Sequence, residues 1–254
     1  MQYNNKGNFL YNDLAWIDTI ITSPQEIKEE AETLCNIIAK NANNEVKSML
    51  HLGCGAGFHD YTFKKHFNLT GVDLSSSMLK IACDLNSEVN YLQGDMRSIV
   101  LDQIFDAVTI PDSIDHMQTI QDLKSAIQTA YQHLKPGGVC LILGHIKEEF
   151  KASNFVYSGK KDNIEVTLFE NNYIPEPFNN TYESSIACMV RKSGKLEIFT
   201  DTFTLGLFDL KTWLNLFKKT GFNVTQDRLD HLYDDYLMDE GEYLTRVFIC
   251  HKPE

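Results

Sequence analysis

A glycine-rich turn follows the first strongly apolar run of the chain. Residues 46–52 read as a buried strand and lead directly into Gly53-Cys54-Gly55-Ala56-Gly57. Glycines here let the backbone approach a ligand closely, and a following helix adds free N–H groups and a positive dipole end. Such a loop alone fits NAD, flavin, S-adenosylmethionine or plain packing. The spacing is GxGxG, however, and Phe58 stands where the dinucleotide fingerprint has a third Gly or Ala.

Two carboxylates follow the next two apolar runs. Asp73 ends the run at residues 69–72, where it could accept hydrogen bonds from both ribose hydroxyls of NAD or S-adenosylmethionine, or cap the next helix. Asp95 follows Gly94, and it could accept from the exocyclic amine of adenine with Met96 packed on the ring, or be a solvent-exposed loop acid. Gly53, Asp73 and Asp95 then lie at three strand ends on one sheet edge, which favours an adenosine-type ligand.

These residues need a sheet to position them, and the hydrophobic pattern predicts one. Strands are predicted at residues 46–52, 69–72, 89–93, 105–110 and 139–143, with helical patterns between them. This alternation predicts parallel pairing and an α/β, doubly wound sheet. Ser23-Pro24-Gln25-Glu26 predicts a helix start with a capping box, and Lys135-Pro136-Gly137-Gly138 a turn.

The pattern changes after about residue 150. Short β-rich runs between residues 165 and 207, with a hairpin turn at Ser193-Gly194, predict an antiparallel insertion of three or four strands. A last helix from Leu210 to Phe217, ended by Gly221, and strands near residues 222–225 and 245–251 complete the main sheet.

Composition narrows the class of protein. The chain has 254 residues, 43% hydrophobic residues and a formal net charge of −12, which disfavours nucleic acid as a partner. Its six cysteines form no CxxC pair, so we expect structural thiols and no metal site. The polar N-terminus and the lack of a long apolar run predict a cytoplasmic protein without membrane association.

Five motifs in order resemble those of class I S-adenosylmethionine-dependent methyltransferases. They are His51-Leu52-Gly53-Cys54-Gly55-Ala56-Gly57, Gly71-Val72-Asp73-Leu74-Ser75, Gln93-Gly94-Asp95-Met96-Arg97, Phe105-Asp106-Ala107-Val108 and Leu134-Lys135-Pro136-Gly137-Gly138. The resemblance implies a Rossmann-like seven-stranded sheet with an antiparallel last strand. It implies that S-adenosylmethionine binds and S-adenosylhomocysteine is the product. The expected cofactor-binding residues are Tyr11, Gly53, Cys54, Gly55, Ala56, Asp73, Leu74, Met78, Gly94, Asp95, Met96 and Pro111.

The third and fourth motifs, with Ser113-Ile114-Asp115-His116-Met117, are also similar to bacterial N,N-dimethyltransferases of nucleotide-linked amino sugars. That resemblance implies a tyrosine near the methionine end of the cofactor, matched by Tyr11, and a histidine near the acceptor amine, matched by His116. The expected acceptor-binding residues are Trp16, Asp112, Ser113, His116, Phe169 and Tyr173. With Phe178 and Tyr182, the last two could form an aromatic wall or simply pack in a core.

The predicted organisation follows from this resemblance. Residues 1–150 are expected to hold N-terminal cap helices and the cofactor-binding core, residues 151–207 an acceptor lobe or lid, and residues 208–254 the elements that complete the core sheet. Exposed hairpins of the insertion could pair across a homodimer. Acidic residues Asp234, Asp235, Asp239, Glu240 and Glu242 would favour a cationic acceptor if they face the site, and otherwise form a solvated loop.

The predicted reaction is methyl transfer to a small molecule, with an amine nitrogen favoured over oxygen. An amine must be neutral to attack, and His116 is the candidate base, with packing at the next helix as its alternative role. Transfer to a hydroxyl, and a non-catalytic protein that binds S-adenosylmethionine or S-adenosylhomocysteine, stay open. An NAD-dependent dehydrogenase is disfavoured by the GxGxG spacing.

Overall fold

The computed structural model describes residues 9–176, 179–229, 234–238 and 243–254. Its centre is a seven-stranded sheet in the order β3-β2-β1-β4-β5-β11-β10. The strands are β1 (Ser48–Leu52), β2 (Asn68–Asp73), β3 (Asn90–Gln93), β4 (Phe105–Ile110), β5 (Leu134–Gly144), β10 (Asn223–Leu229) and β11 (Thr245–His251). Strands β1 to β5 pair in parallel, whereas β11 is antiparallel to both β5 and β10. The predicted Rossmann-like sheet with an antiparallel last strand is confirmed.

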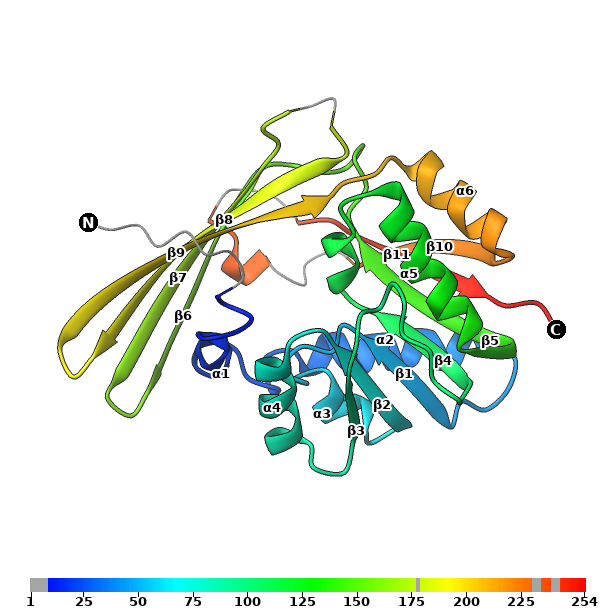
Figure 1. Cartoon of the computed structure of the whole chain (residues 1–254), viewed down its shortest axis with the longest axis horizontal. Coiled ribbons are helices and arrows are strands. Elements are labelled where there is room, and N and C mark those ends of the chain that lie inside the picture. The colour runs from blue at the N-terminus through cyan, green and yellow to red at the C-terminus, as the bar shows by residue number, and fades with distance from the viewer. Residues whose placement is uncertain (1–8, 177–178, 230–233, 239–242) are drawn as a thin grey trace.

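Helices cover both faces of this sheet (Figure 1). On one face α5 (Ile120–Gln132) and α6 (Leu210–Thr220) bury Leu123, Trp213 and Phe217 against the strands. On the other face α2 (Lys28–Asn41) and α3 (Asp60–Phe63) bury Leu34, Ile38 and Phe63. Helix α4 (Ser76–Leu85) packs beside β2 and β3. Strand order reverses between β1 and β4, so a ligand crevice is expected outside the carboxyl ends of these two strands.

A second sheet projects from the core as a long twisted ribbon (Figure 1). It is antiparallel, in the order β6-β7-β8-β9, and comprises β6 (Ser153–Lys161), β7 (Ile164–Tyr173), β8 (Thr181–Lys192) and β9 (Lys195–Gly206). One face packs on the N-terminal elements η1 (Ala15–Ile17) and α1 (Asp18–Ile21) through residues such as Ile17, Leu168 and Ile186. The predicted antiparallel insertion is confirmed, with four strands and the Ser193-Gly194 turn between β8 and β9.

Two local predictions need correction. The Ser23 backbone N–H donates to Glu26 Oε2 at 2.6 Å and Glu26 N–H donates to Ser23 Oγ at 3.4 Å, so the capping box forms, but residues 24–27 are a turn and α2 begins at Lys28. The turn expected at residues 135–138 is instead part of β5. Gly137 adopts a left-handed φ of +73°, and the pairing of β5 with β4 shifts register in this region, so the strand continues through an irregularity.

The cysteines, possible metal ligands and helix lengths were compared with the expectations from composition within the described residues. All six cysteines are free, and five of them are buried. No group of His, Cys, Asp and Glu suited to a metal ion occurs within the described ranges. In those same ranges the helices are too short or too polar to cross a membrane.

Candidate active site

The glycine loop lies across the carboxyl end of β1. Gly53 N–H donates to the Val72 carbonyl at 2.7 Å, which joins the loop to β2. Gly53 has φ +76°, and a Cβ there would lie 2.1 Å from Ser113 Oγ and 2.9 Å from Met96 Cε, so only glycine fits between these side chains. Gly55 has φ +52°, but a Cβ there would meet nothing within 4 Å. The loop therefore packs tightly at Gly53 and exposes bare backbone to open space at Gly55.

Asp73 ties this loop to the next helix. One carboxylate oxygen accepts from Gly55 N–H at 2.8 Å, and the other accepts from Ser75 N–H at 2.8 Å. Ser75 is the N-cap of α4, because its Oγ accepts from Met78 N–H at 3.1 Å. Each Asp73 oxygen keeps a further lone pair, so the carboxylate can accept from two ribose hydroxyls while it holds the loop. The capping and ribose-binding roles are thus compatible.

The segments after β2 and β3 supply an apolar surface and an ion pair. Leu74 is 65% exposed beside this edge, and Met96 packs on the core cluster next to Gly53. Asp95 accepts from Arg97 Nε at 3.0 Å and from its terminal nitrogen at 2.5 Å, and Arg97 also donates to Asp122. These bonds lower the pKa of Asp95, so it is ionised and held by Arg97. Gly94 lies over Ile99, with no room for a side chain.

Three of the predicted cofactor residues are buried. Met78 is 2% exposed and packs with Ala56 of the loop and with Ala15 in one small cluster. Cys54, which belongs to the loop, is buried, and desolvation raises the pKa of its thiol, so it stays protonated. Pro111 is buried directly after β4.

The N-terminal segment brings an aromatic side chain to the turn after β4. The Tyr11 hydroxyl lies 3.3 Å from His116 Nε2, and the Tyr11 ring meets Phe203 of β9 edge-on at 5.3 Å. Ser75 Oγ donates to the Tyr11 carbonyl, so the same residue is also bonded to the start of α4. The His116 side chain keeps contact with solvent, yet desolvation by the surrounding protein lowers its pKa, against the opposing effect of Asp115 and Asp73. The shift favours the neutral imidazole, which is the form able to accept a proton.

Residues 111–116 form the turn between β4 and α5. Asp112 adopts a φ of +55° and is exposed, and it precedes η2 (Ser113–His116). Ser113 Oγ donates to the Leu52 carbonyl at 3.1 Å, which fixes this turn against β1 and the glycine loop. The predicted residues Ser113 and His116 thus lie on one short helical turn beside the loop.

Sequence reasoning missed the histidine that follows β5. His145 Nδ1 lies 2.5 Å from Asp115 Oδ2, and Tyr182 Oη donates to the same oxygen at 3.3 Å. Burial opposes the charged imidazole, but Asp115 outweighs it and raises the pKa of His145. His145 Nε2 is buried without a partner among the described residues. The sequence feature that could have revealed His145 is its position directly after a central strand, at the same sheet edge as Asp73 and His116.

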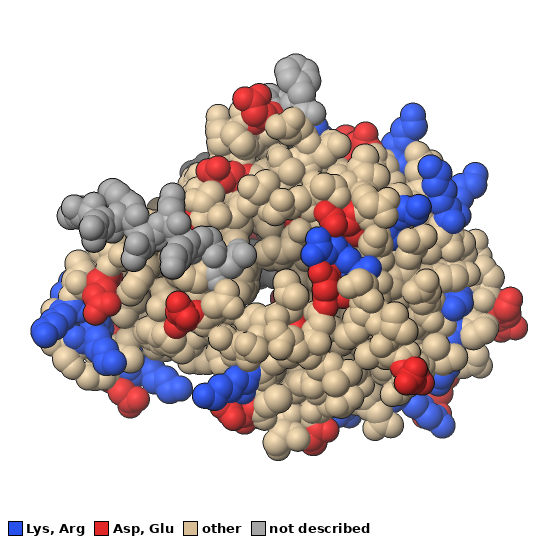
Figure 2. Space-filling model, viewed as in Figure 1, with Lys and Arg blue, Asp and Glu red and all other residues tan. Residues whose placement is uncertain are grey.

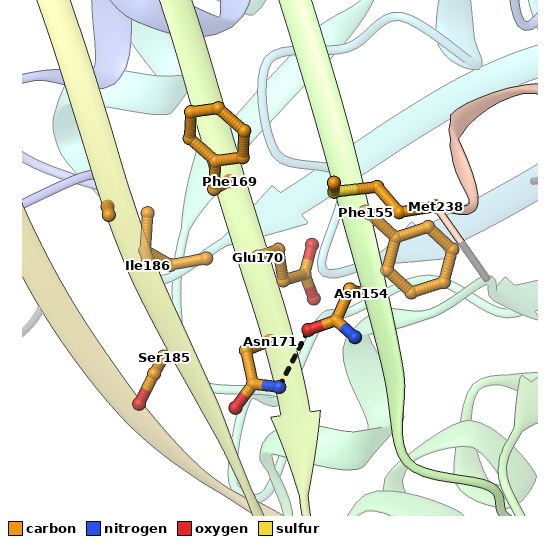
Figure 3. Close-up of a pocket in the computed structure, with 9 residues that line it drawn as sticks. Asn154, Phe155, Phe169, Glu170, Asn171, Ser185, Ile186 and Met238 are labelled. Atoms are coloured by element: carbon orange, nitrogen blue, oxygen red, sulfur yellow. Dashed lines mark hydrogen bonds between the residues drawn. The ribbon is translucent and has the colours of Figure 1, made fainter.

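The predicted aromatic wall does not share one face of the second sheet. Tyr182 is 4% exposed and points toward Asp115, whereas Phe169 and Tyr173 are 37% and 54% exposed on the opposite face. Phe169 borders an open pocket of about 510 Å³ that also includes Met238 and the Asn154–Asn171 pair (Figure 3). Trp16 packs between the N-terminal elements and this sheet. Phe178, Asp239, Glu240 and Glu242 lie outside the described residues.

The site lies where the two sheets approach each other. Figure 2 shows an opening between the part formed by the second sheet and the core on this face of the molecule. The loop, Asp73 and Leu74 come from the core, and Tyr11 bridges to β9 of the second sheet. This arrangement offers backbone, a carboxylate and an exposed apolar side chain to an adenosine, with a neutral imidazole beside it.

Comparisons with known proteins agree with this geometry. A methyltransferase domain model matches residues 50–142. The Bacillus subtilis protein YqeM, which carries a methyltransferase name, is 30% identical over 72% of this chain and 77% of its own length. An N,N-dimethyltransferase of dTDP-3-amino-3,4,6-trideoxy-α-D-glucopyranose from Streptomyces venezuelae is 33% identical over 44% of the chain, and this match spans about half (48%) of that relative.

Other relatives are named as O-methyltransferases. A malonyl-[acyl-carrier protein] O-methyltransferase of Priestia megaterium is 28% identical over 63% of the chain and 59% of its own length. Among solved structures, that of DesVI from Streptomyces venezuelae has a TM-score of 0.75 at 23% identity and covers 95% of this chain and 96% of that chain. This last likeness supports the fold.

Proposed function

The chain belongs to the S-adenosylmethionine-dependent methyltransferases, and from that premise we propose that it transfers a methyl group to an amine nitrogen of a small molecule. The observation that carries the proposal is the Tyr11–His116 pair, with its neutral imidazole, next to the glycine loop and Asp73. When bound, S-adenosylmethionine supplies a methyl group already activated by the sulfonium charge. The protein must therefore align the acceptor and exclude water, which can be worth about 7–11 kcal/mol.

The residues at the core edge fit such a cofactor. Gly55 leaves open space above the loop, where the methionine portion would lie, and Asp73 retains lone pairs for the ribose. The exposed Leu74 would pack on the adenine together with Met96. Asp95 would accept from the adenine amine through a lone pair not used by Arg97.

We further propose that residues 1–150 hold N-terminal cap helices and the cofactor-binding core, that residues 208–254 complete the core sheet, and that residues 151–207 form an acceptor lobe. Phe203 of β9 touches Tyr11, and Tyr182 of β8 touches Asp115, so the second sheet reaches the acceptor edge directly. Trp16 and Tyr11 link this lobe to the loop. Asp112, Ser113 and His116 would line the acceptor site from the core side, while Phe169 and Tyr173, on the far face, would act only indirectly.

Charge at the acceptor edge favours nitrogen over oxygen. Besides burial, the groups that most raise the pKa of Tyr11 are the carboxylates of Asp18, Glu170, Asp73 and Asp201. Attack by a neutral amine forms the C–N bond, breaks the C–S bond and moves positive charge onto nitrogen, which nearby carboxylates stabilise. Attack by a hydroxyl requires a developing oxyanion, which the same carboxylates oppose. Relatives named as amino-sugar N,N-dimethyltransferases support this choice.

O-methylation is the second candidate, because relatives include O-methyltransferases. The test is to incubate the protein with methyl-labelled S-adenosylmethionine and a panel of small amines, nucleotide-linked amino sugars, amino acids and phenols. We expect label on amine acceptors. Label only on phenols or other hydroxyl compounds would show that the methyl group goes to a hydroxyl oxygen and not to an amine nitrogen. Tight cofactor binding without any transfer would instead favour a non-catalytic binding protein.

A further inference from the structure

The inner face of the second sheet carries a polar cluster that the proposed chemistry does not use, the half-buried Glu170 with the buried Asn172 and Ser184. Glu170 of β7 accepts at Oε1 from Asn172 Nδ2 at 3.0 Å and from Ser184 Oγ at 3.1 Å. Asn172 is 2% exposed and Ser184 is 3% exposed. The Tyr157 hydroxyl also hydrogen-bonds to the Glu170 carboxylate. A half-buried carboxylate held by three donors has a fixed orientation.

The cluster of Glu170, Asn172 and Ser184 has more hydrogen-bond acceptors than donors. The Asn172 amide donates to Glu170, but its Oδ1 is buried and has no partner within the described residues. An unpaired buried amide oxygen is costly and calls for a donor. A carboxylate offers about four lone-pair positions, and three of the Glu170 positions are used. The pair Glu170 and Asn172 therefore suits a ligand that brings several N–H groups.

Glu170 lies among the residues of the acceptor edge. Its charge acts on Tyr11 of the N-terminal segment, on His145 after β5, on Tyr182 of β8 and on Tyr243 near β11. Three of these are aromatic rings, and Tyr182 packs further on Phe150 at 4.6 Å. Carboxylate and aromatic faces together are the combination that binds organic cations. Figure 3 shows Glu170 in a row across the sheet between Phe155 and Ile186.

We propose that Glu170 and Asn172 bind the amino group of the acceptor while it is protonated; the ammonium must give one proton to the candidate base His116 before its neutral nitrogen can attack the methyl group. A protonated amine has three N–H donors and one positive charge. The one open position of the Glu170 carboxylate and the unpaired Asn172 Oδ1 can accept two of these donors, and the carboxylate balances the charge. Glu170 is then the residue that selects cationic over neutral acceptors of the same shape. The inference rests on the proposed function only in naming the bound cation as the acceptor.

The probes are cyclohexylamine, which is protonated at neutral pH, and cyclohexanol, its neutral counterpart of similar shape. Binding of each is measured by calorimetry in the presence of S-adenosylhomocysteine. We expect the unmodified protein to bind cyclohexylamine at least tenfold more tightly than cyclohexanol. Glu170→Gln should remove that preference and leave the affinity for cyclohexanol and for S-adenosylhomocysteine unchanged.

The matched control lies on the same strand. Glu165→Gln removes a carboxylate of β7 that is exposed and paired with Lys160, so it should change none of these affinities. Ser184→Ala removes one bond that orients Glu170, and it should weaken cyclohexylamine binding severalfold; it takes the place of Glu170→Gln if that variant does not fold. The proposal would be overturned if the unmodified protein bound the two probes equally or did not bind the amine. It would also be overturned if Glu170→Gln, or Ser184→Ala in its place, kept the preference of the unmodified protein for the amine. If amine binding persists but no methyl transfer occurs, the proposed function fails and this site stands.

Discussion

The Tyr11 hydroxyl lies 3.3 Å from Nε2 of His116, although 105 positions separate the two residues in the chain. The contact joins the N-terminal segment to the turn after β4, and Ser75 fastens the same segment to α4 through the Tyr11 carbonyl. Tyr11 thus links the start of α4, the turn after β4 and, through Phe203, the second sheet. In the proposed function this link holds His116 where the acceptor meets the cofactor.

His116→Ala should lower kcat by about 10²- to 10⁴-fold, the usual contribution of a positioned acid or base. Affinity for S-adenosylhomocysteine, measured by calorimetry, should change by less than about twofold, because Asp73 and the loop remain. The control is His66→Ala, which removes an exposed histidine paired with Glu32. An unchanged kcat would remove His116 from the mechanism.

The pH dependence of kcat should reflect the environment of His116. Burial lowers the pKa of this imidazole below 6.5, so its neutral, proton-accepting form persists at pH values below that point. Turnover should therefore stay constant as pH falls toward 6.5 and decline only at lower pH. The decline should vanish in His116→Ala. A decline that begins above pH 6.5, or that persists in the variant, would assign the titration to another group.

Gly55→Ala separates ligand contact from backbone strain. In both Gly55 (φ +52°) and Gly194 (φ +82°) a Cβ would meet nothing within 4 Å, so alanine should cost about 1–2 kcal/mol of folding stability at either position. Only at Gly55 would the new methyl group occupy the space of the cofactor. Calorimetry should show at least a tenfold loss of S-adenosylhomocysteine affinity for Gly55→Ala and none for Gly194→Ala. Equal affinities would place the cofactor elsewhere.

Asp73→Asn should weaken cofactor binding by about 10- to 100-fold, since hydrogen bonds to a charged group contribute about 1.5–3 kcal/mol. The amide cannot accept at both positions, so it also loses a bond from Gly55 or Ser75 N–H. Asp84→Asn, at an exposed position of α4, is the control. Binding of S-adenosylhomocysteine at the original affinity would exclude Asp73 as the ribose ligand.

Most of the core could be predicted because each signal was local. The apolar runs fixed the strands, and the predicted ranges 105–110 and 245–251 match β4 and β11 residue for residue. Asp73 and Asp95 stood at strand ends, and parallel strands bring such ends together. Where a local signal competed with pairing, pairing prevailed: residues 135–138 joined β5 although their composition favours a turn.

The acceptor side was less predictable because it depends on contacts between distant segments. His145, Asp115 and Tyr182 come from three elements, and nothing in the sequence near His145 indicates its partner. Glu170 alternates with the exposed Phe169 along β7, and the sequence pattern drew attention to the aromatic residue and not to the carboxylate on the other face. The face is set by packing against Ile17 and its neighbours, which no local pattern encodes.

The most direct test of the account is a single competition in which the protein, ¹³C-methyl S-adenosylmethionine and an acceptor with both an amine and a hydroxyl group are followed by NMR. The probe is a dTDP-linked amino sugar, the acceptor type named for relatives of this chain. The account predicts a ¹³C signal of an N-methyl group that grows at the rate at which S-adenosylhomocysteine forms. Growth of an O-methyl signal with no N-methyl signal would contradict it.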